Sequence, residues 1–246
     1  MIIKEKDSVE PQIRELNNLL KLKNLTNTQR EQITFEISNV KKGDKGERET
    51  AYHLNTHLGN SKNIAIIHDF RIEIDGQSAQ IDHLIINRFF EFDILETKNI
   101  KADLRMTPND DFEIFKKSGW EGMASPVEQN KRHIKVLEYF LDQIKIIPEK
   151  AGGIKIEPIF NSWVLVPTSC NITRRMSEMN IVKMDSFCTK RSKVKDKESE
   201  SFLHALKFIF MRMKTANTLE QFASNLACFH TPSTPNYKAK FKIPTS

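Results

Sequence analysis

The stretch QIDHLIINRFFEFDILETKN, residues 80–99, places three charged side chains in or beside apolar runs that have the composition of buried β-strands. Asp82 lies in the first run, Glu96 lies near the end of the second, and Lys98 follows two residues later. Burying a charged group costs free energy unless the charge is paired or binds an ion. We therefore expect two strands here, with a candidate functional site at their polar end.

The two runs are expected to pair as an antiparallel hairpin, because the connection around Phe89 is too short for a crossover between parallel strands. With the turn centred at Phe89, Asp82 faces Glu96 directly. The other facing pairs in this register are Gln80–Lys98, Leu84–Ile94 and Ile86–Phe92. Since side chains alternate between the faces of a strand, all eight residues would share one face. A register shifted by one residue would instead make Asp82 and Glu96 diagonal neighbours.

Two facing carboxylates favour the binding of a divalent cation. Residues directly opposite have Cβ atoms roughly 4.5–5.5 Å apart, where like charges repel. Mg²⁺ prefers carboxylate oxygens and also binds water and phosphate oxygens, and it screens the charge that develops on phosphorus. Lys98 could orient the attacking water or stabilise the pentavalent phosphate, so the pattern indicates phosphodiester hydrolysis. The competing interpretation is that Asp82 and Glu96 are solvated strand-end residues that Lys98 neutralises.

Helical periodicity surrounds this hairpin on both sides. Residues 10–42 are expected to form two helices with a break at 24–28, and the glycines of KKGDKGE are expected to loosen the chain before a new helix from Asp44 to Leu58. The further elements expected are strands at 63–73, 78–86, 90–98 and 111–117, a loop at 118–126, a helix at 126–145, a final buried strand at 160–167, a solvated basic stretch at 189–200, and helices at 201–214 and 218–229. This order predicts a mixed α/β domain with helices at both ends.

Composition narrows the class of protein. The chain has 246 residues and a formal net charge of +6, and a basic surface attracts phosphate backbones without regard to sequence. Its three cysteines are widely spaced, which favours neither a disulfide framework nor a zinc site and fits a reduced cytoplasm. No run of eighteen apolar residues is present, and MIIKEKDSVEPQ is too charged for a secretory signal. We therefore expect a cytoplasmic protein that does not enter a membrane.

Four motifs follow one another along the chain: GDKGE at 43–47, QIDHLII at 80–86, ILETKN at 94–99 and SPVEQNKRHIKVL at 125–137. In this combination the chain resembles the nuclease-related domain (NERD) family, a branch of the PD-(D/E)xK restriction-endonuclease-like superfamily. The resemblance covers roughly residues 43–190, and it implies a restriction-endonuclease-like mixed sheet core flanked by helices. It divides the chain into an N-terminal helical extension (1–42), a nuclease-like domain (43–190) and C-terminal helices with an extended tail (191–246).

The resemblance also implies roles for particular residues. Asp82 and Glu96 would bind Mg²⁺ or Mn²⁺, Glu47 would complete the acidic cluster, and Lys98 would be the catalytic lysine. Gln129 would hold the substrate or water. Two of these assignments compete with structural explanations, because Glu47 also suits the first turn of a helix and Gln129 also suits the polar side of an amphipathic helix. The proline that usually precedes the first aspartate is absent, since Ile81 stands there.

Two histidines lie within these motifs. His83 is expected to face away from Asp82 and to pack, and His133, one helical turn from Gln129, could touch the substrate.

The function implied is a metal-dependent nuclease acting on nucleic acid, with DNA favoured over RNA by the resemblance alone. The alternative is a catalytically silent nuclease-like module that binds nucleic acid or a protein partner. The intact set of Asp82, Glu96 and Lys98 favours the enzyme, because a module that only binds would be free to lose one of them. The terminal helices could serve either function by docking a protein partner or by self-association.

Overall fold

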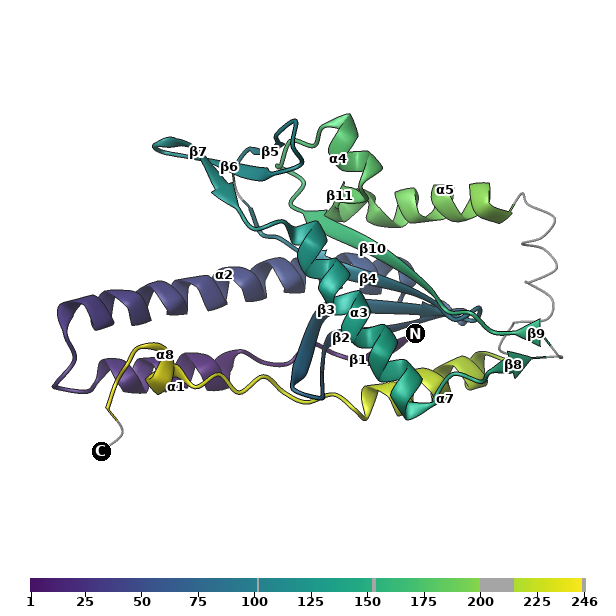
Figure 1. Ribbon diagram of the computed structural model, residues 1–246, viewed down its shortest axis with the longest axis horizontal. Coiled ribbons are helices and arrows are strands. Elements are labelled where there is room, and N and C mark those ends of the chain that lie inside the picture. The colour runs from purple at the N-terminus through teal and green to yellow at the C-terminus, as the bar shows by residue number, and fades with distance from the viewer. Residues whose placement is uncertain (101, 152–153, 200–214, 245–246) are drawn as a thin grey trace.

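The computed structural model describes residues 1–100, 102–151, 154–199 and 215–244. Its centre is a six-stranded mixed sheet (Figure 1). In spatial order the strands are β1 (Ile2–Lys4), β2 (Ile64–Ile74), β3 (Gln77–Asn87), β4 (Glu91–Thr97), β10 (Ile159–Val166) and β11 (Ile181–Lys183). The β2–β3 and β3–β4 pairs are antiparallel, and the other three pairs are parallel. The predicted mixed α/β fold is confirmed.

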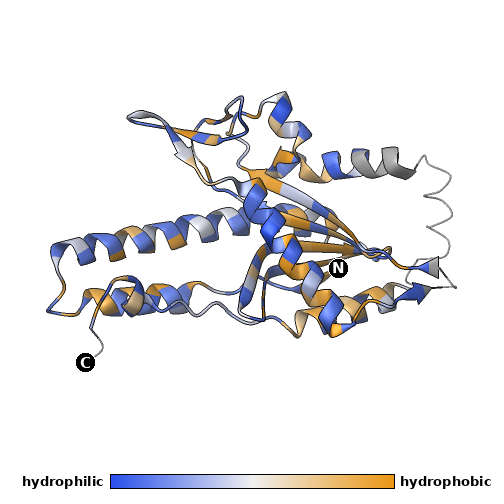
Figure 2. Cartoon of the chain, viewed as in Figure 1, coloured by the Kyte–Doolittle hydropathy of each residue, from blue (hydrophilic) through white to orange (hydrophobic). Residues whose placement is uncertain are grey.

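Helices cover both faces of this sheet. The helices in the described ranges are α1 (Glu10–Leu20), α2 (Asn27–Leu58), α3 (Pro126–Ile144), α4 (Arg174–Glu178), α5 (Phe187–Ser199), α7 (Ala216–Ala227) and α8 (Tyr237–Lys240), with a short 3-10 turn η1 (Met184–Ser186). Leu137 of α3 and Leu219 of α7 join the core on one face, and Leu54 of α2 and Phe187 of α5 join the core on the other. Figure 2 shows hydrophobic residues concentrated along the strands between these layers. None of the helices in the described ranges is both long and apolar enough to cross a membrane.

Two small sheets lie outside the central one. The first contains β5 (Leu104–Met106), β6 (Phe112–Lys116) and β7 (Gly119–Met123), and the second pairs β8 (Lys150–Ala151) with β9 (Ile154–Lys155). The strand expected at 111–117 is present, but the loop expected at 118–126 is wrong, because β7 pairs there with β6. The strand at 160–167 is also not the last, since β11 adds to its edge. The helix expected at 201–214 lies outside the described residues.

Helix α2 is longer than its sequence predicted. Its start is fixed by Thr26, which accepts from the backbone N–H of Gln29 at 3.2 Å, and the helix then continues through Gly43 and Gly46. The helix start expected at Asp44 is therefore wrong. Gly46 does not break the helix; it allows close approach, because a Cβ there would lie 2.7 Å from the Cβ of Asn99. The boundary proposed between residues 42 and 43 falls inside this helix.

The hairpin forms in the predicted register. Leu84 pairs with Ile94 and Ile86 with Phe92, and the paired region ends at His83 and Leu95. The preceding hairpin turns at Asp75 and Gly76, both with positive φ, which matches a two-residue type I′ turn.

Side-chain alternation breaks further along β2 and β3. Ile67 and Phe70 belong to the same core cluster, and so do Ile81 and Leu84, although strict alternation would separate the members of each pair. The break lies at Asp69, whose φ is +51°, and at Asp82, which stands at the equivalent place in the β2–β3 pairing. The prediction that eight residues share one face is therefore wrong for Gln80, which is exposed and donates to Asp69 Oδ1 at 2.9 Å. The bend turns the sheet at the point where the carboxylates lie.

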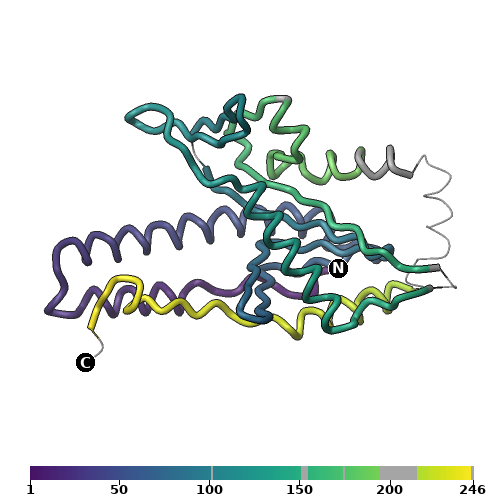
Figure 3. The backbone as a smooth tube through the Cα atoms, viewed as in Figure 1, coloured from purple at the N-terminus to yellow at the C-terminus, as the bar shows by residue number. Residues whose placement is uncertain are grey.

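The C-terminal tail runs alongside α1 (Figure 3). Tyr237 and Phe241 of the tail pack with Leu16 of α1 and Ile33 of α2 in a separate small core. The Tyr237 hydroxyl donates to Gln12 Oε1 at 3.0 Å. This core holds α1 and the C-terminal tail against the first half of α2.

Candidate active site

Asp82 lies where the hairpin pairing stops. The backbone N–H of Thr97, at the end of β4, donates to Asp82 Oδ2 at 2.7 Å. The carboxylate thus takes the hydrogen bond that a strand neighbour would otherwise accept. This contact fixes Asp82 beside Glu96, which precedes Thr97 on β4.

Glu96, Lys98 and Gln129 form one hydrogen-bonded group. Lys98 Nζ donates to Glu96 Oε1 at 2.7 Å and to Gln129 Oε1 at 2.9 Å. The backbone N–H of Lys98 donates to Leu165 O at 2.8 Å, which ties this residue to β10. Gln129 lies in the first turn of α3, whose start is capped by Ser125. The structure therefore brings together three of the residues predicted for the site.

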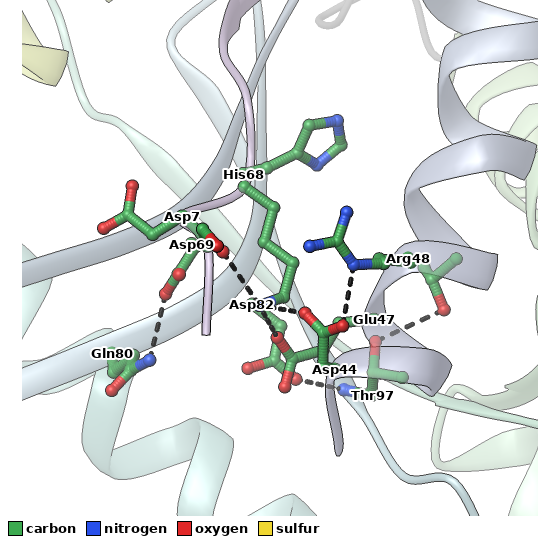
Figure 4. A network of polar contacts seen from close by, with 12 residues as sticks. Asp7, Asp44, Glu47, Arg48, His68, Asp69, Gln80, Asp82 and Thr97 are labelled. Atoms are coloured by element: carbon green, nitrogen blue, oxygen red, sulfur yellow. Dashed lines mark hydrogen bonds and ion pairs between the residues drawn. The ribbon is translucent and has the colours of Figure 1, made fainter. Parts of the chain in front are cut away.

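Glu47 joins the group from α2. It stands in the middle of this helix, not in a first turn, so the helix dipole does not explain its position. Figure 4 shows the carboxylates of Asp44, Glu47 and Asp82 close together. The acidic cluster therefore contains one residue, Asp44, that sequence analysis missed.

The carboxylates act on one another electrostatically. Burial raises the pKa of Asp82 well above its ordinary value, and the charges of Glu96 and Glu47 raise it further. Burial also raises the pKa of Glu96, although Lys98 opposes this, and Glu47 adds to the rise. The cluster thus holds more negative charge than its surroundings fully compensate.

Lys6 is the largest omission of the sequence analysis. Its Nζ lies 3.1 Å from Asp44 Oδ1 and 3.1 Å from Glu47 Oε2, and its side chain is only 7% exposed. The residue comes from the segment between β1 and α1, about forty positions before its partners. Nothing in the local sequence distinguishes it from the other lysines, since only the pairing of β1 with β2 brings it here.

His133 of α3 borders the same group. Its Nδ1 lies 3.8 Å from Glu96 Oε2, which is too far for a hydrogen bond, and within the described part of the chain that atom has no hydrogen-bond partner. Burial lowers the pKa of His133 to about 4, and Arg132 and Lys98 act in the same direction. A neutral imidazole therefore faces the carboxylate at neutral pH.

His83 packs, as expected, on the side of the sheet that α2 covers. His68 Nε2 lies 2.8 Å from Asn55 Oδ1, and since that oxygen only accepts, His68 Nδ1 must accept from His83 Nδ1, also at 2.8 Å. Both rings are buried. The hydrogen-bonded series Asn55–His68–His83 thus joins α2 to β2 and β3 next to Asp82.

The donor set suits a hard divalent cation in its chemistry. Asp82, Glu96 and Glu47 offer carboxylate oxygens, the ligands that Mg²⁺ prefers, and a divalent cation would offset the burial and the mutual repulsion that raise their pKa values. Within the ranges that the structure describes, no group of three His, Cys, Asp or Glu side chains is arranged to hold a metal ion. The positive charge beside these carboxylates comes from Lys6 and Lys98.

A cavity of about 330 Å³ opens beside the cluster. Its walls include Lys6, Glu47 and Asp69, and the tail residues Pro232–Thr234 form another side. Both ends of the chain thus contribute to the surroundings of the site.

Comparison with known proteins gives one match. The family model NERD, described as nuclease-related domain, matches residues 42–165, just over half of the chain. No curated protein matches, and no solved structure matches. The matched region contains Glu47, Asp82, Glu96, Lys98 and Gln129, and it excludes Lys6.

Proposed function

Because the chain belongs to the nuclease-related domain (NERD) family, we propose that it is a metal-dependent nuclease that hydrolyses phosphodiester bonds of nucleic acid. The observation that carries this proposal is the contact of Lys98 Nζ with both Glu96 Oε1 and Gln129 Oε1, next to the carboxylate of Asp82. The ammonium group of Lys98, the amide of Gln129 and the carboxylates of Asp82 and Glu96 come from three different parts of the fold. Glu96 is only 3% exposed, so it is not a solvated residue at the end of a strand, and the group suits phosphate chemistry.

Each side chain has a separate role in this proposal. Asp82 and Glu96 hold Mg²⁺ or Mn²⁺, and Glu47 completes the acidic cluster. When bound, the cation screens the charge that develops on phosphorus and makes water a better nucleophile. Lys98 places its ammonium group against the phosphate oxygens, and Gln129 holds the Lys98 side chain in that direction.

DNA is the substrate that we favour over RNA, on the family resemblance, and the net charge of +6 supports attraction to either polymer. We also propose a cytoplasmic location, which the three unpaired cysteines Cys170, Cys188 and Cys228 support. The alternative function is a silent nuclease-like module that binds nucleic acid or a protein partner without cleaving.

Cleavage of supercoiled, linear and single-stranded DNA, and of RNA, with Mg²⁺ or Mn²⁺ tests the proposal. We expect metal-dependent cutting that EDTA stops and that falls roughly 100-fold or more in Asp82→Asn and Lys98→Met, in line with the loss of one group that stabilises transition-state charge. Lys131→Met, an exposed lysine in the same helix as Gln129, is the matched control and should cut like wild type.

Circular dichroism of each variant separates loss of chemistry from loss of fold. Salt-sensitive binding of these polymers by a wild-type protein that cuts none of them would contradict the nuclease and favour the silent module.

A further inference from the structure

We propose that Lys6 is a built-in cation of the acidic site, occupying the place beside Glu47 where a second divalent ion would bind, so that the site takes one metal ion. This role of Lys6 rests on the proposed function, in which Asp82 and Glu96 hold that single ion. Lys6 lies outside the region that the family model matches, so its role belongs to this chain's own N-terminal segment.

The geometry of Lys6 is that of a bound cation. Its Nζ is equidistant, at 3.1 Å, from Asp44 Oδ1 and Glu47 Oε2, which lie one helical turn apart on α2. With 7% of its side chain exposed, Lys6 meets solvent only where it lines the neighbouring cavity. A lysine is rarely buried to this extent unless carboxylates compensate its charge, and here two of them do.

The fold holds Lys6 in place from both sides. Before it, β1 pairs with β2 through Ile2 and Ile66, and Lys4 Nζ donates to the backbone oxygen of His68 at 3.1 Å. After it, Asp7 Oδ2 lies 2.8 Å from His230 Nε2 of the tail. The ammonium is therefore positioned by flanking contacts, unlike a surface lysine that pairs by chance.

Lys6 and Lys98 pair with different carboxylates of the cluster. Lys98 pairs with Glu96, and Lys6 pairs with Glu47 and with Asp44, whose other oxygen lies 2.7 Å from Arg48 Nε. Glu47 therefore already has an ammonium group 3.1 Å from its Oε2, and Asp82 with Glu96 remains for an added cation.

A neighbouring cavity gives an added ion access to this place. Lys6 and Glu47 line the cavity of about 330 Å³ beside the cluster. Removing the ammonium would leave Glu47 without its cation, and Asp44 would keep its pairing with Arg48, whose Nε lies 2.7 Å from Asp44 Oδ2. Asp44 Oδ1 and the Glu47 carboxylate would then face space that an ion can reach. Such a pair is the kind of oxygen ligand that Mn²⁺ and Mg²⁺ accept.

Counting bound Mn²⁺ on the full chain, from the free-ion signal in electron paramagnetic resonance, tests the role of Lys6. We expect Lys6→Met to bind one more Mn²⁺ per chain than wild type, and Lys6→Arg, which keeps the charge, to bind the same number as wild type. Lys41→Met removes the same charge from an exposed position on α2 and should leave the number unchanged. The additional ion should be lost in Lys6→Met combined with Glu47→Gln.

Thermal melting gives a second readout. Lys6→Met should melt below wild type without metal, and added Mn²⁺ should raise its melting temperature more than that of wild type. If Lys6→Met does not fold, Lys6→Gln, which keeps a donor for the carboxylates, gives the same comparison. An unchanged number of ions in the folded neutral variant, or an additional ion that persists without Glu47, would overturn the role of Lys6.

These outcomes are separate from those of the proposed function. Wild type that binds no Mn²⁺ while Lys6→Met gains one ion would contradict the metal site of Asp82 and Glu96 and leave the role of Lys6 intact. If wild type binds Mn²⁺ and cuts nucleic acid while Lys6→Met binds no additional ion, the role of Lys6 is contradicted and the metal site of Asp82 and Glu96 is supported.

Discussion

At the scale of single residues, hydrogen-bond geometry separates side chains that the sequence presents as equivalent. His68, His83 and His133 are all buried or partly buried near the site, yet they meet different partners. His68 and His83 bond each other and Asn55, whereas the Nδ1 of His133 faces Glu96 without a hydrogen bond. The first two therefore bear on stability, and the third bears on the carboxylate that we assign to metal binding.

The buried pair predicts how stability depends on pH. Burial lowers the pKa of His68 to about 4, and that of His83 falls well below its ordinary value. The unfolded chain, with ordinary histidine pKa values near 6.5, then binds more protons than the native state between these limits, so stability is lost as the pH falls from 6.5 toward 4. At 1.36 kcal/mol per pKa unit, His68 alone costs about 2 kcal/mol on going from pH 7 to pH 4.5.

Urea unfolding at these two pH values measures this loss. The free energy of unfolding should fall by about 2 kcal/mol less in His68→Gln than in wild type. His57→Gln, at an exposed position near the end of α2, is the control and should follow wild type. Asp82 and Glu96 act in the opposite direction, because carboxylates with raised pKa values take up protons in the native state first. The test is therefore the difference between His68→Gln and wild type, and not the pH dependence of unfolding free energy in either protein alone.

At the scale of elements, the hairpin was predictable and α2 was not. The register of β3 with β4 follows from a short connection and a local apolar pattern, and both are visible in twenty residues. The course of α2 through Gly43 and Gly46 depends on Asn99, whose Nδ2 donates to Lys42 O at 2.7 Å from the segment after β4. A tertiary contact thus overrides the weak helix propensity of glycine.

The two glycines of α2 should respond oppositely to alanine. In a helix interior, Gly→Ala gains roughly 0.5–1 kcal/mol when space is available. A Cβ at Gly43 would lie 3.7 Å from Glu47 Oε1, an ordinary contact, so Gly43→Ala should be neutral or stabilising. A Cβ at Gly46 would lie 2.7 Å from Asn99 Cβ, and overpacking of this kind costs roughly 1–3 kcal/mol.

Denaturant unfolding of both variants compares these effects. We expect Gly46→Ala to lose about 1–2 kcal/mol relative to wild type, after the gain in helix propensity is subtracted. Asn99→Gly in the same chain should restore part of that loss by removing the Cβ that clashes. Equal stability of Gly43→Ala and Gly46→Ala would show that α2 is free to move away from Asn99.

Lys6 shows why the rest of the site could not be read from sequence. Asp82, Glu96 and Lys98 lie within seventeen residues, and a strand pattern is enough to bring them together. Lys6 reaches the same place only because an edge strand is added in parallel to β2, and such pairing leaves no local signature. The sequence likewise predicts a helix start beside Glu47, since continuity of α2 past two glycines depends on contacts that the sequence does not display.

At the scale of the whole molecule, both ends of the chain support one side of the site. The tail meets the N-terminal segment at His230 and Asp7, the edge of β2 at Thr231 and Arg71, and α1 and α2 through Tyr237 and its neighbours. Self-association through the terminal helices stays a prediction. The packing of the tail against α1 and α2 already gives the terminal segments a structural role within a single chain.

Tyr237 is the residue through which this arrangement can be tested. It is 1% exposed and closes the small core formed by α1, α2 and the tail, so Tyr237→Ala should cost about 3 kcal/mol of local stability. Because this core is separate from the three that contain residues of the sheet, we expect a partial opening that leaves the sheet folded. Hydrogen exchange should speed up in α1, in the first half of α2 and in residues 5–9, with β3 and β4 still protected.

Tyr52→Ala, at a tyrosine that is 68% exposed on α2, is the control and should change stability by less than about 0.5 kcal/mol. Faster exchange in β3 and β4 together with α1 would mean that the terminal core and the sheet unfold as one unit, and slow exchange at residues 5–9 would mean that β1 alone holds Lys6 in the site.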